Sequence, residues 1–116
     1  MTAGAAATRL MLYLTEDDRV DSRSLADVVI ERARDAGLVG ATLWRGLEGF
    51  GASGRLRAAR LPDLARGLPL VVEIIDAPEV VAGFLPVLRE LAAGALLTLE
   101  PVTMERGTEP VVAPVG

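Results

Sequence analysis

Residues 49–54 read Gly-Phe-Gly-Ala-Ser-Gly, a G-x-G-x-x-G pattern, and this is where the residue types first suggest chemistry. In dinucleotide-binding proteins such glycines let backbone N–H groups at the start of a helix approach a pyrophosphate closely. The segments around these glycines partly match the strand–helix–strand arrangement of a dinucleotide-binding site. A strand pattern precedes the glycines, residues 55–65 could be helical, and the next strand pattern ends in Asp76.

Three features disfavour a dinucleotide site. Pro62 would interrupt the helix, whose apolar stripe of Leu56, Ala59 and Leu64 is thin. A chain of 116 residues also supplies too few strands for a complete doubly wound domain. The glycines could instead simply permit a tight turn at the end of a strand.

Arginine is concentrated around the same glycines. Residues 45–66 hold five Arg against Glu48 and Asp63, a net charge of +3 in a chain whose net charge is −4. A basic segment on an acidic protein is suited to an anionic ligand or to an acidic partner surface. A solvated loop that binds nothing is the plainer alternative.

The chain contains no Cys, no His and no Lys, so all 12 of its cationic side chains are Arg. This composition excludes disulfides, thiolate nucleophiles, imidazole bases, the usual zinc sites and Schiff-base chemistry. An enzyme would need paired carboxylates, Tyr13 or one of Ser22, Ser24 and Ser53, and no pattern places a base beside any of them. We therefore expect no catalytic residues and no enzymatic activity. The negative net charge and only four aromatic residues disfavour nucleic acid as a partner.

Two acidic features have weaker implications. Glu16, Asp17 and Asp18 follow the first strand pattern and could ligate Mg²⁺ or Ca²⁺, but a solvated turn, or a partner for Arg19, is the commoner outcome. We therefore expect no metal. Glu73 lies in an otherwise apolar strand pattern, and we expect it to pair with an arginine rather than to act in catalysis.

The elements that position these residues follow from the hydrophobic periodicity. Alternating apolar residues predict strands at 8–14, 40–47, 69–76 and 95–99, the last stopped near Pro101. Helical spacing predicts one helix that begins near Ser24 and ends at Gly37, and a second between residues 76 and 94. The order is that of the ferredoxin-like βαββαβ unit, an α+β fold with a four-stranded antiparallel sheet and two helices on one face.

The second helix has two distinctive signals. Asp76 and Glu79 would form a capping box at its start, with Pro78 in the first turn. Pro86 lies inside the helical pattern and would kink the helix or shorten its first half.

Both faces of the predicted sheet are apolar. In the strand at 69–76, Val72 and Ile74 alternate with Val71 and Ile75, and the first strand adds Met11 and Tyr13 opposite its leucines. Two helices cover only one face of such a sheet. The other face would be an association surface, which predicts a homo-oligomer with closed cyclic symmetry.

The two ends of the chain lack a usable pattern. We expect a disordered tail at 1–7, a domain at 8–104 and a flexible tail at 105–116. Residues 1–8 lack the basic and apolar regions of a signal peptide. The apolar stretch at 91–99 is about half of the ~20 residues that a membrane helix needs. We expect a soluble, cytoplasmic protein without direct membrane insertion.

Three stretches resemble the PII-like family known as domain of unknown function 190. They are Glu16–Arg19, the block Gly-Leu-Glu-Gly-Phe-Gly-Ala at 46–52, and residues 68–76. The block at 46–52 is the most specific part of a resemblance that spans about residues 9–102. More distantly, residues 49–51 resemble the Gly-Phe-Gly at the base of the T-loop in nitrogen-regulatory PII signalling proteins.

The resemblance implies a homotrimer with its sheets facing inward, an adenine nucleotide bound as an effector between subunits, and a mobile loop that regulates a partner protein. On this basis residues 52–61 would form the partner-reading segment. The partner would be a protein such as a membrane transporter or an enzyme. The implied ligand-binding residues are Glu48, Gly49, Phe50, Gly51, Ala52 and Ser53, and the implied partner-loop residues are Arg55, Arg57 and Arg60.

The sequence departs from PII proteins in one respect that bears on the ligand. PII proteins have a second loop with Gly and Lys that grips phosphates before the last strand, whereas residues 92–95 here are Ala-Ala-Gly-Ala. Beyond the last strand, Arg106 is the only cation. These departures favour a less highly charged adenylate than a triphosphate. A ligand-free trimeric interaction module stays open as an alternative.

Overall fold

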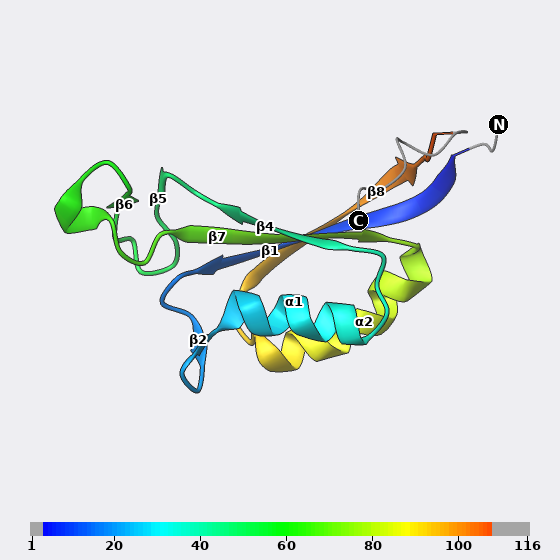
Figure 1. Ribbon diagram of the computed structural model, residues 1–116, viewed down its shortest axis with the longest axis horizontal. Helices are drawn as coiled ribbons and strands as arrows, with labels where there is room; N and C mark the ends of the chain where they lie inside the picture. Colours follow the sequence, from blue (N-terminus) through cyan, green and yellow to red (C-terminus); the bar gives the residue numbers. More distant parts are fainter. Residues whose placement is uncertain (1–3, 108–116) are drawn as a thin grey trace, which may run out of the picture.

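The computed structural model describes residues 4–107, in which two helices cover one face of a four-stranded antiparallel sheet (Figure 1). The strands lie in the order β4 (Ala41–Arg45), β7 (Pro69–Asp76), β1 (Ala5–Thr15) and β8 (Leu96–Met104). Helix α1 (Leu25–Asp35) follows β1 and helix α2 (Pro78–Leu91) follows β7. The predicted ferredoxin-like fold is therefore confirmed.

The centre of the sheet explains why one face carries the core. Strands β1 and β7 are antiparallel, with Leu10 opposite Ile74 and Leu12 opposite Val72. Because side chains alternate between faces along a strand, these four residues point to the same side, where all are fully buried. The helices cover them with apolar residues at three- and four-residue spacing: Leu25, Val29 and Ala33 of α1, and Val81, Phe84 and Leu88 of α2.

The opposite face of the sheet has no helix of the described chain over it (Figure 1). Tyr13 and Trp44 lie on this side and are 40% and 55% exposed. We call this surface the open face, and its apolar members are Met11, Tyr13, Trp44, Val71, Ile75 and Leu96. The strands therefore carry apolar residues on both faces of the sheet, as predicted, and one of these faces is uncovered within a single chain.

Three ion-paired side chains lie among these apolar residues on the open face. Arg9 Nη2 lies 2.6 Å from Glu100 Oε1, and Arg9 Nε lies 3.7 Å from Glu73 Oε2. Since β1 lies between β7 and β8, one arginine reaches carboxylates on both neighbouring strands. The expectation that Glu73 pairs with an arginine is confirmed, and the pair lies within one sheet.

Several strand boundaries differ from the prediction. β1 begins at Ala5 rather than Thr8, so residues 5–7 of the expected N-terminal tail belong to the sheet. β4 ends at Arg45, two residues earlier than expected. The prediction that the last strand stops near Pro101 is wrong, since β8 continues to Met104. β8 is an edge strand, and a residue without an N–H is tolerated there because its outer side needs no partner.

The start of α2 also differs. The N-cap residue is Ala77 and no side chain caps the helix, so the predicted capping box of Asp76 and Glu79 is wrong. Asp76 ends β7 as a buried residue and accepts hydrogen bonds from two backbone N–H groups instead. Pro86 does not shorten the helix, which runs from Pro78 to Leu91.

Between β4 and β7 the chain forms a small ribbon that extends beyond one end of the sheet (Figure 1). Strand β5 (Glu48–Gly49) pairs with β6 (Arg57–Ala58), and a short 3-10 helix, η1 (Pro62–Leu64), follows. We call residues 48–58 the glycine-rich ribbon. No crossover helix occurs at 55–65 and the sheet is antiparallel, so the dinucleotide-binding interpretation is wrong.

Two short segments of the described chain lie outside the four-stranded sheet and the ribbon. A hairpin of β2 (Arg19–Val20) and β3 (Arg23–Ser24) precedes α1. Residues 105–107 of the expected C-terminal tail follow β8 without regular structure, while residues 1–3 and 108–116 lie outside the described part of the chain. Among residues 4–107, neither helix has the length and apolar character needed to cross a membrane.

Candidate functional site

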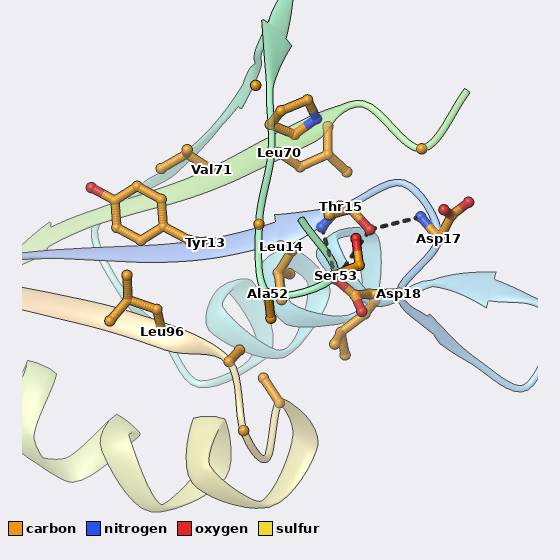
Figure 2. A pocket seen from close by; sticks show the side chains of 18 of the residues that line it. Tyr13, Leu14, Thr15, Asp17, Asp18, Ala52, Ser53, Leu70, Val71 and Leu96 are labelled. Carbon is orange, nitrogen blue, oxygen red and sulfur yellow. Dashed lines mark hydrogen bonds between the residues drawn. The ribbon is translucent and has the colours of Figure 1, made fainter. Parts of the chain in front are cut away.

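A cleft of about 880 Å³ lies where the glycine-rich ribbon meets the end of the sheet. Its floor includes Tyr13 and Val71 of the open face, and one wall is the loop at 49–53. Figure 2 shows the chain at Ala52 and Ser53 passing across the end of β1, with the acidic turn after β1 beside it. The cleft therefore joins three segments that are far apart in the sequence: the turn after β1, the ribbon, and the α2–β8 turn.

The glycines bring the ribbon close to the sheet. A Cβ on Gly49 would lie 3.1 Å from Pro69 Cγ, and one on Gly46 would lie 3.0 Å from Pro69 Cβ. Both contacts are tighter than side chains normally make, so residues without side chains allow the base of the ribbon to lie on Pro69. Farther along, the N–H of Gly54 donates to the carbonyl of Gly51 at 2.9 Å, in a turn where Gly54 has a φ of 72°.

The opposite wall consists of small residues. The turn from α2 to β8 contributes Ala92, Ala93, Gly94 and Ala95 to the cleft. Gly94 has a φ of 83°, a left-handed conformation in which the chain leaves the helix. This turn offers space and backbone groups to a ligand but no cationic side chain.

The charged lining of the cleft consists of two carboxylates and two guanidinium groups: Asp17, Asp18, Arg55 and Arg57. Arg57 Nη2 lies 3.7 Å from Asp17 Oδ2, too far for a hydrogen bond, and the Arg57 side chain is only 16% exposed. The Asp18 carboxylate is already hydrogen-bonded to the backbone, because its Oδ2 accepts the Thr15 N–H at 2.7 Å. Arg55 and Arg57 are therefore the cations that an anion in this cleft would meet.

The acidic turn after β1 is organised by ion pairs and backbone contacts. Glu16 Oε1 accepts a hydrogen bond from the Leu68 N–H at 3.0 Å, and Glu16 Oε2 lies 3.0 Å from Arg45 Nη2. Arg19, whose pairing with these acids was one of the two expected outcomes alongside a solvated turn, instead donates to the carbonyl of Ser22. No cluster of three or more potential metal ligands occurs within residues 4–107.

The structure brings most of the implied site residues together. Gly49, Phe50, Gly51, Ala52 and Ser53 all line the cleft, whereas Glu48 is not among its lining residues. Glu48 is paired with Arg60 across the base of the ribbon, at 3.3 Å between Oε1 and Nη2. Of the three implied partner-loop arginines, Arg55 and Arg57 line the cleft and Arg60 does not.

Sequence reasoning missed several residues of the cleft. Tyr13, Thr15 and Leu96 line it because β1 and β8 end beside the ribbon, and no local motif signals that meeting. Asp17 carried a signal, since it belongs to the acidic turn, but its pairing with Arg57 joins positions forty residues apart. Only the packing of the ribbon against the turn reveals that pair.

With this geometry established, comparison with known proteins places the chain in a family. The model of the DUF190 family, described as "Uncharacterized ACR", matches residues 7–104. The chain belongs to this family. A UPF0166 protein of Aquifex aeolicus (strain VF5) is 37% identical to it over 93 residues, which are 80% of this chain and 88% of that protein.

Solved structures show the same fold at low sequence identity. A chain from Thermus thermophilus, described as PII-like, superposes with a TM-score of 0.65 at 19% identity, covering 89% of this chain and 93% of that one. CPII of Thiomonas intermedia K12, bound to ADP and bicarbonate, gives a TM-score of 0.62 at 16% identity, covering 90% and 93%. CPII is also known with ADP, AMP and bicarbonate. This DUF190 chain therefore has the PII-like ferredoxin-like fold, and the resemblance to that family is confirmed.

Proposed function

We propose that this DUF190 protein is a PII-like regulatory protein that binds a small anionic effector, an adenine nucleotide, in the cleft beside the glycine-rich ribbon. The observation that carries the proposal is the cleft itself. It combines the glycine loop at 49–53 with two arginines, Arg55 and Arg57, and has room for a nucleotide. The binding of ADP and AMP by CPII, which shares the fold, supports the choice of ligand.

The number of phosphates is part of the proposal. Two arginines and two aspartates line the cleft, and the α2–β8 turn adds no cation. Each added phosphate brings further negative charge that has to be matched. Because a single chain offers only two arginines here, the cleft favours AMP or ADP over ATP.

A homotrimer is the assembly we propose. The open face provides an uncovered apolar surface, and the cleft is continuous with it through Tyr13, Val71 and Leu96. Packing of open faces around a three-fold axis would bury the apolar residues and turn each cleft into a crevice between subunits. The cytoplasmic location stays a prediction, as does the absence of enzymatic activity.

The test is a binding panel. Titration of the purified protein with ATP, ADP, AMP and cyclic AMP, followed by calorimetry and by the unfolding temperature, should show binding that is tighter for AMP or ADP than for ATP. Binding raises the apparent stability by mass action. A panel in which none of the four nucleotides binds would remove the nucleotide from the proposal.

A second candidate function is a ligand-free interaction module, and one observation favours it. Phe50 and Leu56 of the ribbon are exposed, Phe50 by 74%, and so are Leu47 and Leu61 on either side of it, Leu47 by 77%. Apolar side chains on a projecting ribbon suit contact with a partner protein. A partner captured equally well with and without nucleotide, and lost in a Phe50→Ser variant, would favour this module over the nucleotide sensor.

A further inference from the structure

The two side chains of one ion pair in the cleft differ greatly in their exposure to solvent. The Arg57 side chain is 16% exposed, whereas that of Asp17, its ion-pair partner, is 68% exposed. A guanidinium has five N–H donors, and a distance of 3.7 Å to the carboxylate provides attraction without a hydrogen bond. Arg57 is therefore held in the cleft with its hydrogen-bonding capacity toward Asp17 unused.

The backbone of Asp17 is anchored within the turn after β1. Its backbone N–H donates to Thr15 Oγ1 at 3.1 Å. Its carboxylate lies so close to the Cα of Gly67 that a Cβ on Gly67 would collide with it. Gly67 has a φ of 65°, so this position favours glycine for its backbone as well as for its space. The turn thus presents the Asp17 carboxylate to the ribbon.

Arg57 is also part of the ribbon's framework. It lies opposite Gly49 in the β5–β6 pair, and both residues line the cleft. The Arg57–Asp17 pair therefore links the ribbon to the turn after β1. Anything that draws the guanidinium away from Asp17 acts on the position of the ribbon.

We propose that Arg57 is an anion-controlled link between the ribbon and the acidic turn: a phosphate group entering the cleft competes with Asp17 for the guanidinium, and the ribbon and the turn then separate. The inference rests on the proposed function in placing the effector in this cleft, and it adds the residue that transmits binding. A phosphate accepts two hydrogen bonds from a guanidinium at short range, so it displaces an ion pair that has none. Asp17 is exposed enough for water to solvate it once the pair is broken.

Two substitutions at this pair have opposite predicted effects on anion binding. Asp17→Asn removes the competing charge and should tighten binding of AMP, ADP or inorganic pyrophosphate about threefold. Arg57→Gln removes the phosphate-binding group and should weaken it about tenfold. Arg60→Gln is the matched control, because Arg60 lies just after the ribbon and is paired with Glu48 outside the cleft lining, and it should change affinity by less than about twofold.

The second readout is hydrogen exchange of residues 47–61 without any ligand. Both Asp17→Asn and Arg57→Gln should speed exchange in the ribbon, because each breaks the link, and Arg60→Gln should leave the segment contacting the turn unchanged. Pyrophosphate added to the wild type should speed exchange in the turn at 15–19 rather than protect it. Misfolding cannot imitate tighter binding by Asp17→Asn, so the experiment does not depend on the Arg57 variant folding well.

The outcomes separate this inference from the proposed function. Binding of pyrophosphate but not of nucleotides, with opposite effects of the two variants, would support the link and overturn the adenine-nucleotide effector. Nucleotide binding that both variants weaken, or that Arg57→Gln leaves unchanged, would overturn the link and leave the proposed function standing. Adenosine serves as the uncharged comparison, and affinity that does not distinguish adenosine from AMP would also overturn the link.

Discussion

Asp76 Oδ2 accepts a hydrogen bond from the backbone N–H of Val39 at 2.8 Å, which ties the end of β7 to the chain that leads from α1 into β4. The other carboxylate oxygen accepts the N–H of Ala77 at 2.7 Å, where α2 begins. Asp76 is only 5% exposed and is the one buried charged residue in the described core. A single side chain thus joins the two βα halves of the fold.

Replacing Asp76 with Ala should destabilise the protein by about 2–3 kcal/mol, because two backbone N–H groups lose their acceptor in a largely buried site. Asp76→Asn keeps one acceptor oxygen and should cost about half as much. Urea unfolding measures both. Asp35→Ala, at an exposed position near the end of α1, is the control and should stay within ~0.5 kcal/mol of the wild type. Equal stability of Asp76→Ala and Asp35→Ala would contradict the role of Asp76.

Gly67→Ala should be more destabilising than Gly37→Ala, although both glycines have positive φ values, 65° and 81°. Each alanine pays about 1–2 kcal/mol for the left-handed backbone. At Gly37 a Cβ meets nothing within 4 Å, whereas at Gly67 it meets the Asp17 carboxylate. Because that carboxylate is the exposed end of a flexible side chain and can move aside, urea unfolding of the two variants should differ by no more than ~1 kcal/mol. Equal losses of unfolding free energy would mean that the Asp17 side chain makes room for the added methyl group at no cost.

Met11→Arg should dissociate the proposed trimer without unfolding the chain. Met11 lies at the centre of the open face and opposite Glu73, so an arginine there is compatible with an isolated subunit. Burying that added charge between subunits is costly. Sedimentation velocity should show a shift from trimer to monomer, with the circular dichroism spectrum unchanged. Leu56→Arg, on the exposed ribbon, is the control and should leave the assembly as it is.

The hydrogen bond that Glu31 accepts from Arg23, followed by the attraction of that guanidinium, holds the pKa of Glu31 below its ordinary value. A lowered pKa in the folded state stabilises the protein above the pKa of the unfolded chain, and this contribution is lost as the pH falls through the folded-state pKa. Carboxyl NMR titration should show that Arg23→Gln raises the pKa of Glu31. Both side chains are exposed, so the effect on stability should be small and should weaken in high salt. An unchanged titration in Arg23→Gln would show that the pair does not persist in solution.

The fold could be predicted from the amino-acid sequence. Two-residue alternation around Leu10–Leu14 and across β7, together with helical spacing in α1 and α2, requires a sheet with helices on one side, and the structure agrees. The same alternation, apolar on both faces, already pointed to the open face. These are local properties, because which side a residue faces depends only on its position along its own strand or helix.

The arrangement of the cleft and the pairing of its charged residues became visible only in the three-dimensional structure. The sequence predicted that Asp76 caps a helix, whereas the buried side chain accepts a hydrogen bond from Val39. It also predicted that the last strand ends near Pro101, whereas Pro101 lies within an edge strand. The pairing of Arg57 with Asp17 joins the ribbon to a turn that no periodicity relates to it. Contacts of this kind depend on how separate elements pack in space, which local sequence patterns do not encode.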